Sequence, residues 1–318
     1  MPKHKIQGLS YDAVLLAVVR LLTTFLGIFS TSILSKSLSL ALYGTYSQAN
    51  LVISAGTSFS ILGMSDGINY FFNKISKREK AQLYVNTLFT LQGTLGIALG
   101  LSILIFQKLI IAYFQNAQLA GLFIYIAFRP LMSNFIAMLQ VLQVSIGRAK
   151  TIAYRNAFVA IAKLCAIVFS VKVIEDIRGV FIILLLVDVL TVVYFAMSFS
   201  QEKFVIAPVR LKWDRVIEIA KFCIPMGLYV LTNSLSRDLD KMVIGRMGGT
   251  EELAIYTNCS ALLPVDIISA AFLTVIIPIM TRYVADAKWE DGKRLFSNYL
   301  QQGYLTTVTF SGALIVLS

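Results

Sequence analysis

Residues 179–200 read GVFIILLLVDVLTVVYFAMSFS and contain one charged side chain, Asp188. A helix needs about 20 apolar residues to cross a bilayer, whereas a strand of a membrane barrel needs about ten. Eight other apolar stretches have comparable length and composition, so about nine transmembrane helices are predicted. Their approximate positions are 12–34, 42–72, 82–106, 118–146, 152–173, 179–200, 221–246, 252–281 and 295–317.

The composition of the whole chain agrees with this interpretation. Of 318 residues, 57% are hydrophobic and 14% are charged, and the mean hydropathy is +0.76. Soluble domains carry about a quarter charged residues. The chain is therefore predicted to be an all-α integral membrane protein, which excludes a peripheral enzyme and a single-span receptor.

The chain has a net charge of +11, and its basic residues are distributed unevenly over the predicted loops. Eighteen Lys and Arg residues fall in the N-terminal tail and in the loops after even-numbered spans, and five fall in the opposite loops. Because cytoplasmic loops are enriched in Lys and Arg, the N-terminus is predicted to be cytoplasmic. Most of the basic excess is a topology signal, and no nucleic-acid partner is expected.

Histidine and cysteine offer little chemistry for catalysis or metal binding. The only histidine is His4, and Cys165, Cys223 and Cys259 lie far apart in the sequence. This spacing predicts neither a disulfide framework nor a zinc site. We expect a protein that is not an enzyme and that has no catalytic residue, metal or cofactor.

An internal repeat relates the two ends of the chain. With an offset of 210 residues, Ile33–Lys36 aligns with Val243–Arg246, and Gly44–Ala49 aligns with Ala254–Cys259. The shared pattern is a cation at the end of one helix, then a tyrosine, a hydroxyl and an amide entering the next. This offset places spans one to three on spans seven to nine, which predicts a two-lobe bundle of parallel six-helix repeats.

The repeat also predicts the domain organisation. Residues 1–200 form a six-helix N-terminal lobe, residues 201–220 an amphipathic cytoplasmic connector, and residues 221–318 the first three helices of a C-terminal lobe. Position 318 maps onto Lys108 at the end of the third span. The second lobe is therefore expected to be incomplete, as in a C-terminally shortened transporter.

Several cations fall inside the predicted spans, where each costs on the order of 3 kcal/mol to insert. Such residues usually face a wet cavity or a partner, so an anion-binding cavity between the lobes is predicted. An alternative stays open: Arg129 or Lys163 pairs with Asp188 and holds helices together. The predicted cavity residues are Arg20, Arg129, Lys163, Arg237, Lys241 and Asn233.

Acidic residues in the spans are candidates for coupling transport to a proton or sodium ion. They are Asp66 and Asp188 in the first lobe and Asp266 in the second. On the seventh span, pairing of Arg237 with Asp240 and of Asp238 with Lys241, three residues apart, is the alternative to a role in the cavity.

Five segments of the sequence resemble polysaccharide-transporter proteins of the multidrug/oligosaccharidyl-lipid/polysaccharide exporter superfamily, which include O-antigen and capsule flippases. The proline block and the Asp-Lys-x-x-Ile-Gly block are the more specific of these. The segments are CIPMGL (223–228), LDKMVIGRMGG (239–249), ELAIY (252–256), QVLQVSIGRAK (140–150) and ALYGTY (41–46). Lys36 stands where an arginine is common in that family.

The resemblance implies a flippase in the inner membrane of a bacterial or archaeal cell. Its substrate would be a polyprenyl-pyrophosphate-linked oligosaccharide for lipopolysaccharide, O-antigen or capsule synthesis, moved by alternating access. Membrane lipids, a coupling ion and polysaccharide polymerase machinery would be its partners. A cationic cavity suits this substrate, since guanidinium groups bind phosphate in a bidentate manner.

Two other functions remain as alternatives. A cation-coupled drug antiporter of the same fold would need an acidic cavity, against which the excess of buried cations argues. A membrane-embedded glycan polymerase would need an exposed metal motif. Asp238 and Asp240 have the Asp-x-Asp spacing of such a motif, but they are predicted to lie inside a helix beside Arg237 and Lys241, which is unfavourable for metal binding.

Overall fold

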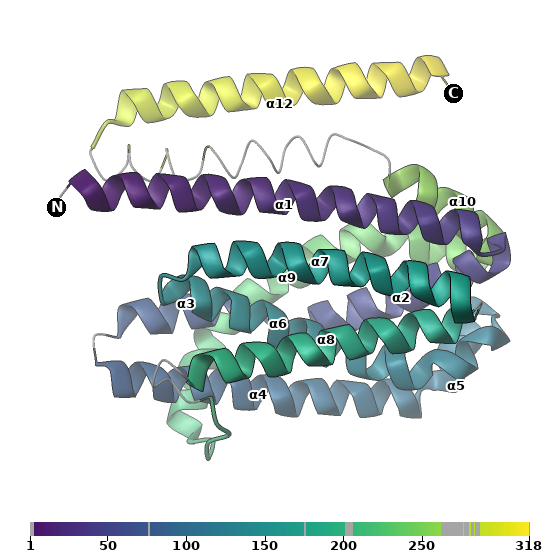
Figure 1. Ribbon diagram of the computed structural model, residues 1–318, viewed down its shortest axis with the longest axis horizontal. Helices are drawn as coiled ribbons and strands as arrows, with labels where there is room; N and C mark the ends of the chain where they lie inside the picture. Colours follow the sequence, from purple (N-terminus) through teal and green to yellow (C-terminus); the bar gives the residue numbers. More distant parts are fainter. Residues whose placement is uncertain are drawn as a thin grey trace. The chain divides into compact units, whose positions relative to one another are not determined.

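A computed structural model describes residues 3–75, 77–174, 176–200, 206–261, 276, 280, 283 and 287–317 of the chain. Every regular element in these ranges is helical (Figure 1). The elements are α1 (Lys3–Ser37), α2 (Leu40–Ile61), α3 (Met64–Lys74), α4 (Arg78–Ile105), α5 (Gln107–Phe114), η1 (Ala117–Leu122), α6 (Phe123–Ser145), α7 (Ala149–Phe169), the π-helical η2 (Ser170–Ile174), α8 (Ile177–Ser200), α9 (Trp213–Met247), α10 (Gly249–Ala261) and α12 (Trp289–Leu317).

The predicted all-helical membrane fold is confirmed. In the described ranges, seven segments are long and apolar enough to cross a bilayer, and they correspond to the first seven predicted spans. The predicted eighth span, 252–281, lies mostly outside the described residues. The ninth forms α12, which is not one of the seven because glutamine, threonine and serine dilute its apolar residues.

The helix boundaries reproduce the internal repeat. Corresponding helix starts are Leu40 and Gly249, and Arg78 and Trp289, and corresponding helix ends are Ser37 and Met247. Each pair is separated by 209 to 211 residues, against the sequence offset of 210. The chain therefore breaks its helices at equivalent places in the two halves, as a duplicated bundle requires.

The chain consists of two compact units. The first comprises residues 1–28, 149–160 and 259–318, and its described elements are the first part of α1, the first part of α7 and α12. The second comprises residues 29–148 and 161–258 and contains the remaining helices.

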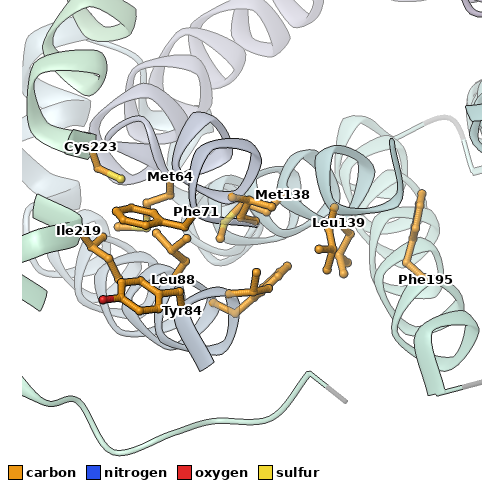
Figure 2. Close-up of a cluster of buried hydrophobic side chains, with 13 residues drawn as sticks. Met64, Phe71, Tyr84, Leu88, Met138, Leu139, Phe195, Ile219 and Cys223 are labelled. Carbon is orange, nitrogen blue, oxygen red and sulfur yellow. The ribbon is translucent and has the colours of Figure 1, made fainter. Parts of the chain in front are cut away.

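Helix α6 is the centre of the second unit. It packs against α2, α3, α4 and α8, while α9 packs against α2 and α3. Figure 2 shows a buried cluster that joins these helices at one end of the unit, with Ile219 and Cys223 of α9 on one side and Phe195 of α8 on the other. Phe71 and Tyr84, whose ring centroids are 5.0 Å apart, stack on the side of the cluster that faces Ile219 and Cys223.

The second predicted span is broken between α2 and α3. Leu62 and Gly63 both have left-handed backbone conformations, with φ of 39° and 70°. A side chain at position 63 would also collide with α9, since a Cβ there would lie 2.6 Å from the carbonyl oxygen of Cys223. Gly63 thus combines a helix break with a close approach of two backbones.

Helix α9 begins at Trp213, within the residues predicted as the connector. Residues 206–212 are non-helical, and Asp214 in the first turn of α9 favours helix initiation there. Ile219 is 2% exposed and belongs to the cluster of Figure 2, so packing carries the helix on into the seventh span. The helical half of the predicted connector is therefore continuous with that span.

Candidate substrate-binding site

Asp188 joins two of the predicted cavity cations in one ion-pair triad. Its carboxylate lies 2.6 Å from Nζ of Lys163 and 3.5 Å from Nη2 of Arg129. The three side chains come from α8, α7 and α6, all within the second unit. The open alternative, pairing of Arg129 or Lys163 with Asp188, is realised for both cations at once.

The triad keeps a net charge of +1 inside the helical bundle. The side chain of Asp188 is 1% exposed, whereas those of Arg129 and Lys163 are 13% and 34% exposed. Asp188 lies eleven residues from Ile177, or about 16 Å along α8. A charge at this depth is far from either end of the helix.

The guanidinium of Arg129 has donors to spare. Its Nε is buried and has no hydrogen-bond partner, and its contact with Asp188 is at the long distance of 3.5 Å. Arginine carries five N–H donors in a planar fork, and this carboxylate engages little of that capacity. The triad therefore still has a cationic donor for an additional anion.

The charged residues of the seventh span form a separate group on α9. The predicted pair of Asp238 and Lys241 is present at 3.9 Å, and Ser54 of α2 donates a hydrogen bond to Asp238 at 2.7 Å. Asp240 accepts a hydrogen bond from Tyr256 instead of pairing with Arg237. Lys241 is thus held mainly within its own helix.

Arg237 and Asn233 have exposed side chains on α9. In the described part of the chain, Arg237 makes neither an ion pair nor a side-chain hydrogen bond, and no contact joins it to the triad. The structure therefore brings two predicted cavity residues, Arg129 and Lys163, together with Asp188. Arg237 and Asn233 lie apart from them, on α9.

The remaining predicted residues are placed as follows. Arg20 is exposed and belongs to the first unit, and its carbonyl oxygen accepts hydrogen bonds from Thr23 and Thr24. Asp66 is exposed in the first turn of α3, where a carboxylate stabilises the helix N-terminus. Asp266 lies outside the described residues. Their predicted roles in substrate binding or ion coupling stay predictions.

A polar network joins α2 to α9 through Asn116, the residue that precedes η1. Asn116 donates to Thr45 at 2.9 Å and to Gln48 at 2.7 Å, and Gln48 donates to the carbonyl oxygen of Gly245 at 3.1 Å. These groups satisfy one another within the bundle. Their role is structural, and the only sequence signal for it was the repeated tyrosine-hydroxyl-amide pattern around Gln48.

No described trio of histidine, cysteine, aspartate or glutamate side chains could hold a metal ion. The charge that remains on the triad of Arg129, Lys163 and Asp188 is positive, which is the sign that an anion would require.

Comparisons with known proteins agree with this architecture. Residues 33–308 match the family described as polysaccharide biosynthesis protein. No curated protein sequence matches the chain. Among solved structures, the MATE multidrug transporter DinF-BH, solved in a ligand complex, is 13% identical with a TM-score of 0.68 over all of this chain and 72% of its own.

Two further solved structures share the fold. A MATE transporter in complex with MaL6 is 13% identical, with a TM-score of 0.61 over 96% of this chain and 72% of its own. A MOP superfamily transporter from Pyrococcus furiosus, described as having a binding pocket of reverse polarity, is 14% identical with a TM-score of 0.52. That match covers 97% of this chain and 71% of the other. At these identities the likeness establishes the fold.

Proposed function

Since the chain belongs to the polysaccharide biosynthesis protein family and has the fold of MOP-superfamily transporters, we propose that this multi-pass membrane transporter is a flippase. It moves a polyprenyl-pyrophosphate-linked oligosaccharide across the cell membrane by alternating access, for synthesis of surface polysaccharide such as O-antigen or capsule. Its N-terminus is cytoplasmic, as the distribution of Lys and Arg predicts.

The observation that carries this proposal is the cationic triad of Arg129, Lys163 and Asp188. Replacing a buried ion triad by apolar residues is often neutral or stabilising, so helix packing alone does not require one. The spare donors of Arg129 match the oxygens of a pyrophosphate. The side chain of Lys163 is 34% exposed, so its ammonium group is accessible to a ligand. It can therefore exchange the carboxylate of Asp188 for a phosphate.

The membrane potential favours this direction of transport. An inside-negative potential favours outward movement of an anion by about 2.3 kcal/mol per charge per 100 mV. In this proposal, Asp188 holds the two cations together while no substrate is bound. Protonation of Asp188, or entry of a coupling ion beside it, would release them to the phosphates.

The test is translocation of a labelled polyprenyl-pyrophosphate oligosaccharide in proteoliposomes. The triple variant Arg129→Met/Lys163→Met/Asp188→Leu removes the net charge and retains side-chain volume, so we expect at least a tenfold loss of rate. The control Lys293→Met removes a cation whose pair with Glu290 is exposed, and it should translocate normally. Normal translocation by the triple variant would contradict the proposed role of the triad.

A cation-coupled drug antiporter is the second candidate, because two of the fold neighbours are MATE transporters. It predicts uptake of a cationic dye into the same proteoliposomes when a proton or sodium gradient is imposed. Dye transport without movement of the lipid-linked oligosaccharide would favour this function over a flippase.

A further inference from the structure

A concave apolar groove lies on the second unit between α4, α6 and α8. Its volume is about 380 Å³, and its walls include Phe89 and Gly93 of α4, Phe135 of α6 and Val192 of α8. The rings of Phe89 and Phe135 stack with centroids 6.1 Å apart and form part of the lining. This is a different place from the triad, none of whose members lines the groove.

A non-helical segment forms part of the wall of the groove. Ile206, Ala207 and Pro208, which follow α8, are among the lining residues, and the backbone N–H of Val209 donates a hydrogen bond to Thr90 at 3.1 Å. Packing among transmembrane helices alone does not produce such a wall. The groove is thus a built recess and not merely a gap between two helices.

The groove offers its occupant no free hydroxyl donor. Thr90 and Thr94, its only hydroxyl-bearing lining residues, donate to the carbonyl oxygens of Asn86 and Leu91. Gly93 lies fifteen residues from Arg78, or about 22 Å along a helix of about 42 Å. The groove therefore reaches the middle of α4, where the surrounding solvent is hydrocarbon.

Positive charges directly follow the segment that lines the groove. Arg210 and Lys212 are exposed, and Arg215 at the start of α9 donates a hydrogen bond from Nη1 to Thr87 at 2.9 Å. Two acids, Asp214 and Glu218, lie near these three cations, and Glu218 accepts a hydrogen bond from Tyr84. The matching ligand has an apolar chain next to an anionic head.

In a bilayer, an apolar groove gains little from the hydrophobic effect, because lipid tails are as apolar as its walls. Binding must come from packing around the chain and from charge at the head. A single recess of about 380 Å³ has room for one chain, which fits a single-tailed anionic lipid better than a two-tailed phospholipid.

We propose that the groove between α4, α6 and α8 binds the isoprenoid chain of a polyprenyl phosphate or pyrophosphate carrier, with Arg210 and Lys212 facing its head group. This site rests on the proposed function, because the carrier is the lipid part of the proposed substrate. In the predicted topology Arg210 and Lys212 are cytoplasmic, so the groove holds the carrier on the side from which it is loaded.

The groove can be filled from one position without disturbing its walls. A Cβ at Gly93 would lie 3.6 Å from Cζ of Phe135, an ordinary contact, so Gly93→Ala keeps the groove open and Gly93→Trp fills it. Thr94→Trp is a second filling variant, at an exposed position. Leu101→Trp, 55% exposed on the same helix and not part of the groove, is the matched control.

The experiment is photolabelling in proteoliposomes with a polyprenyl phosphate that carries a diazirine in its chain, followed by peptide mapping. We expect labelling of α4, α6 or α8 in the wild type, Gly93→Ala and Leu101→Trp, and at least a fivefold loss in both filling variants. Unlabelled polyprenyl phosphate should compete, and phosphatidylglycerol should not. Equal labelling of all variants, or equal competition by phosphatidylglycerol, would overturn the proposal.

The head-group part has its own measurement. Arg210→Gln/Lys212→Gln should weaken competition by polyprenyl phosphate about tenfold while leaving neutral polyprenol unchanged; loss of both or of neither would contradict the assignment. Photolabelling requires neither glycan nor transport. If labelling maps to the groove but no oligosaccharide is moved, the flippase function is contradicted and the lipid site stands. If oligosaccharide is moved and labelling maps elsewhere, the lipid site is contradicted and the flippase function stands.

Discussion

Asp188→Asn tests whether one carboxylate holds two helices to α8 through their cations. The substitution conserves shape and removes the negative charge that faces Lys163 at 2.6 Å and Arg129 at 3.5 Å. At an effective dielectric constant of about 20, the closer pair attracts by about 6 kcal/mol, most of which offsets desolvation.

The expected cost follows from what the variant leaves behind. Removing one partner of a buried pair typically costs about 3–5 kcal/mol, because the remaining charge is buried without compensation. Lys163 is 34% exposed, so the protein encloses its charge only in part, and its share of this cost is reduced. We therefore expect Asp188→Asn to lower the free energy of unfolding by about 3 kcal/mol, near the lower end of that range.

A double-mutant cycle separates the ion pair from other effects. Equilibrium unfolding in mixed micelles would be measured for Asp188→Asn, Lys163→Met and the double variant. Because the double variant carries one unpaired cation fewer, it should be more stable than the sum of the single effects by at least about 1 kcal/mol. The exposed pair of Lys293 and Glu290 is the control, and Lys293→Met should change stability by less than about 0.5 kcal/mol. Strict additivity at Asp188 and Lys163 would refute the pairing.

Two other predictions concern packing and topology. Gly44→Val should lower the free energy of unfolding by more than the roughly 1–3 kcal/mol typical of overpacking, since a Cβ there would lie 1.9 Å from the carbonyl oxygen of Thr250. The control is Gly27→Ala, because a Cβ at Gly27 would have no atom within 4 Å. Equal unfolding free energies of the two variants would contradict the contact at Gly44. In a cysteine-free background, a cysteine at Glu251 should react with an impermeant thiol reagent in intact cells, and one at Lys150 only after permeabilisation. Both positions are exposed and helical, so a reversed labelling pattern would invert the predicted orientation.

The sequence predicts the helices and their duplication well because both depend on local composition. A run such as 179–200 needs only its length to be identified as a span, and helix boundaries near Ser37 and Met247 recur at the offset read from short matched segments. What local composition does not supply is the long-range contact that accompanies an interruption of a span. The break at Leu62 and Gly63 arises where α9 approaches the backbone, and that contact joins residues more than 150 positions apart.

The candidate site shows the same division between local and long-range information. Insertion cost alone identifies Arg129, Lys163 and Asp188 as residues that need partners, but helix periodicity gives no angle between α6, α7 and α8. Pairing and anion binding were therefore alternatives at the level of sequence. In the structure they are compatible, since two cations share one carboxylate and a donor of Arg129 remains unused. A pairing that satisfied every charge would leave no cationic donor for the proposed anionic substrate, whereas this triad retains one on Arg129.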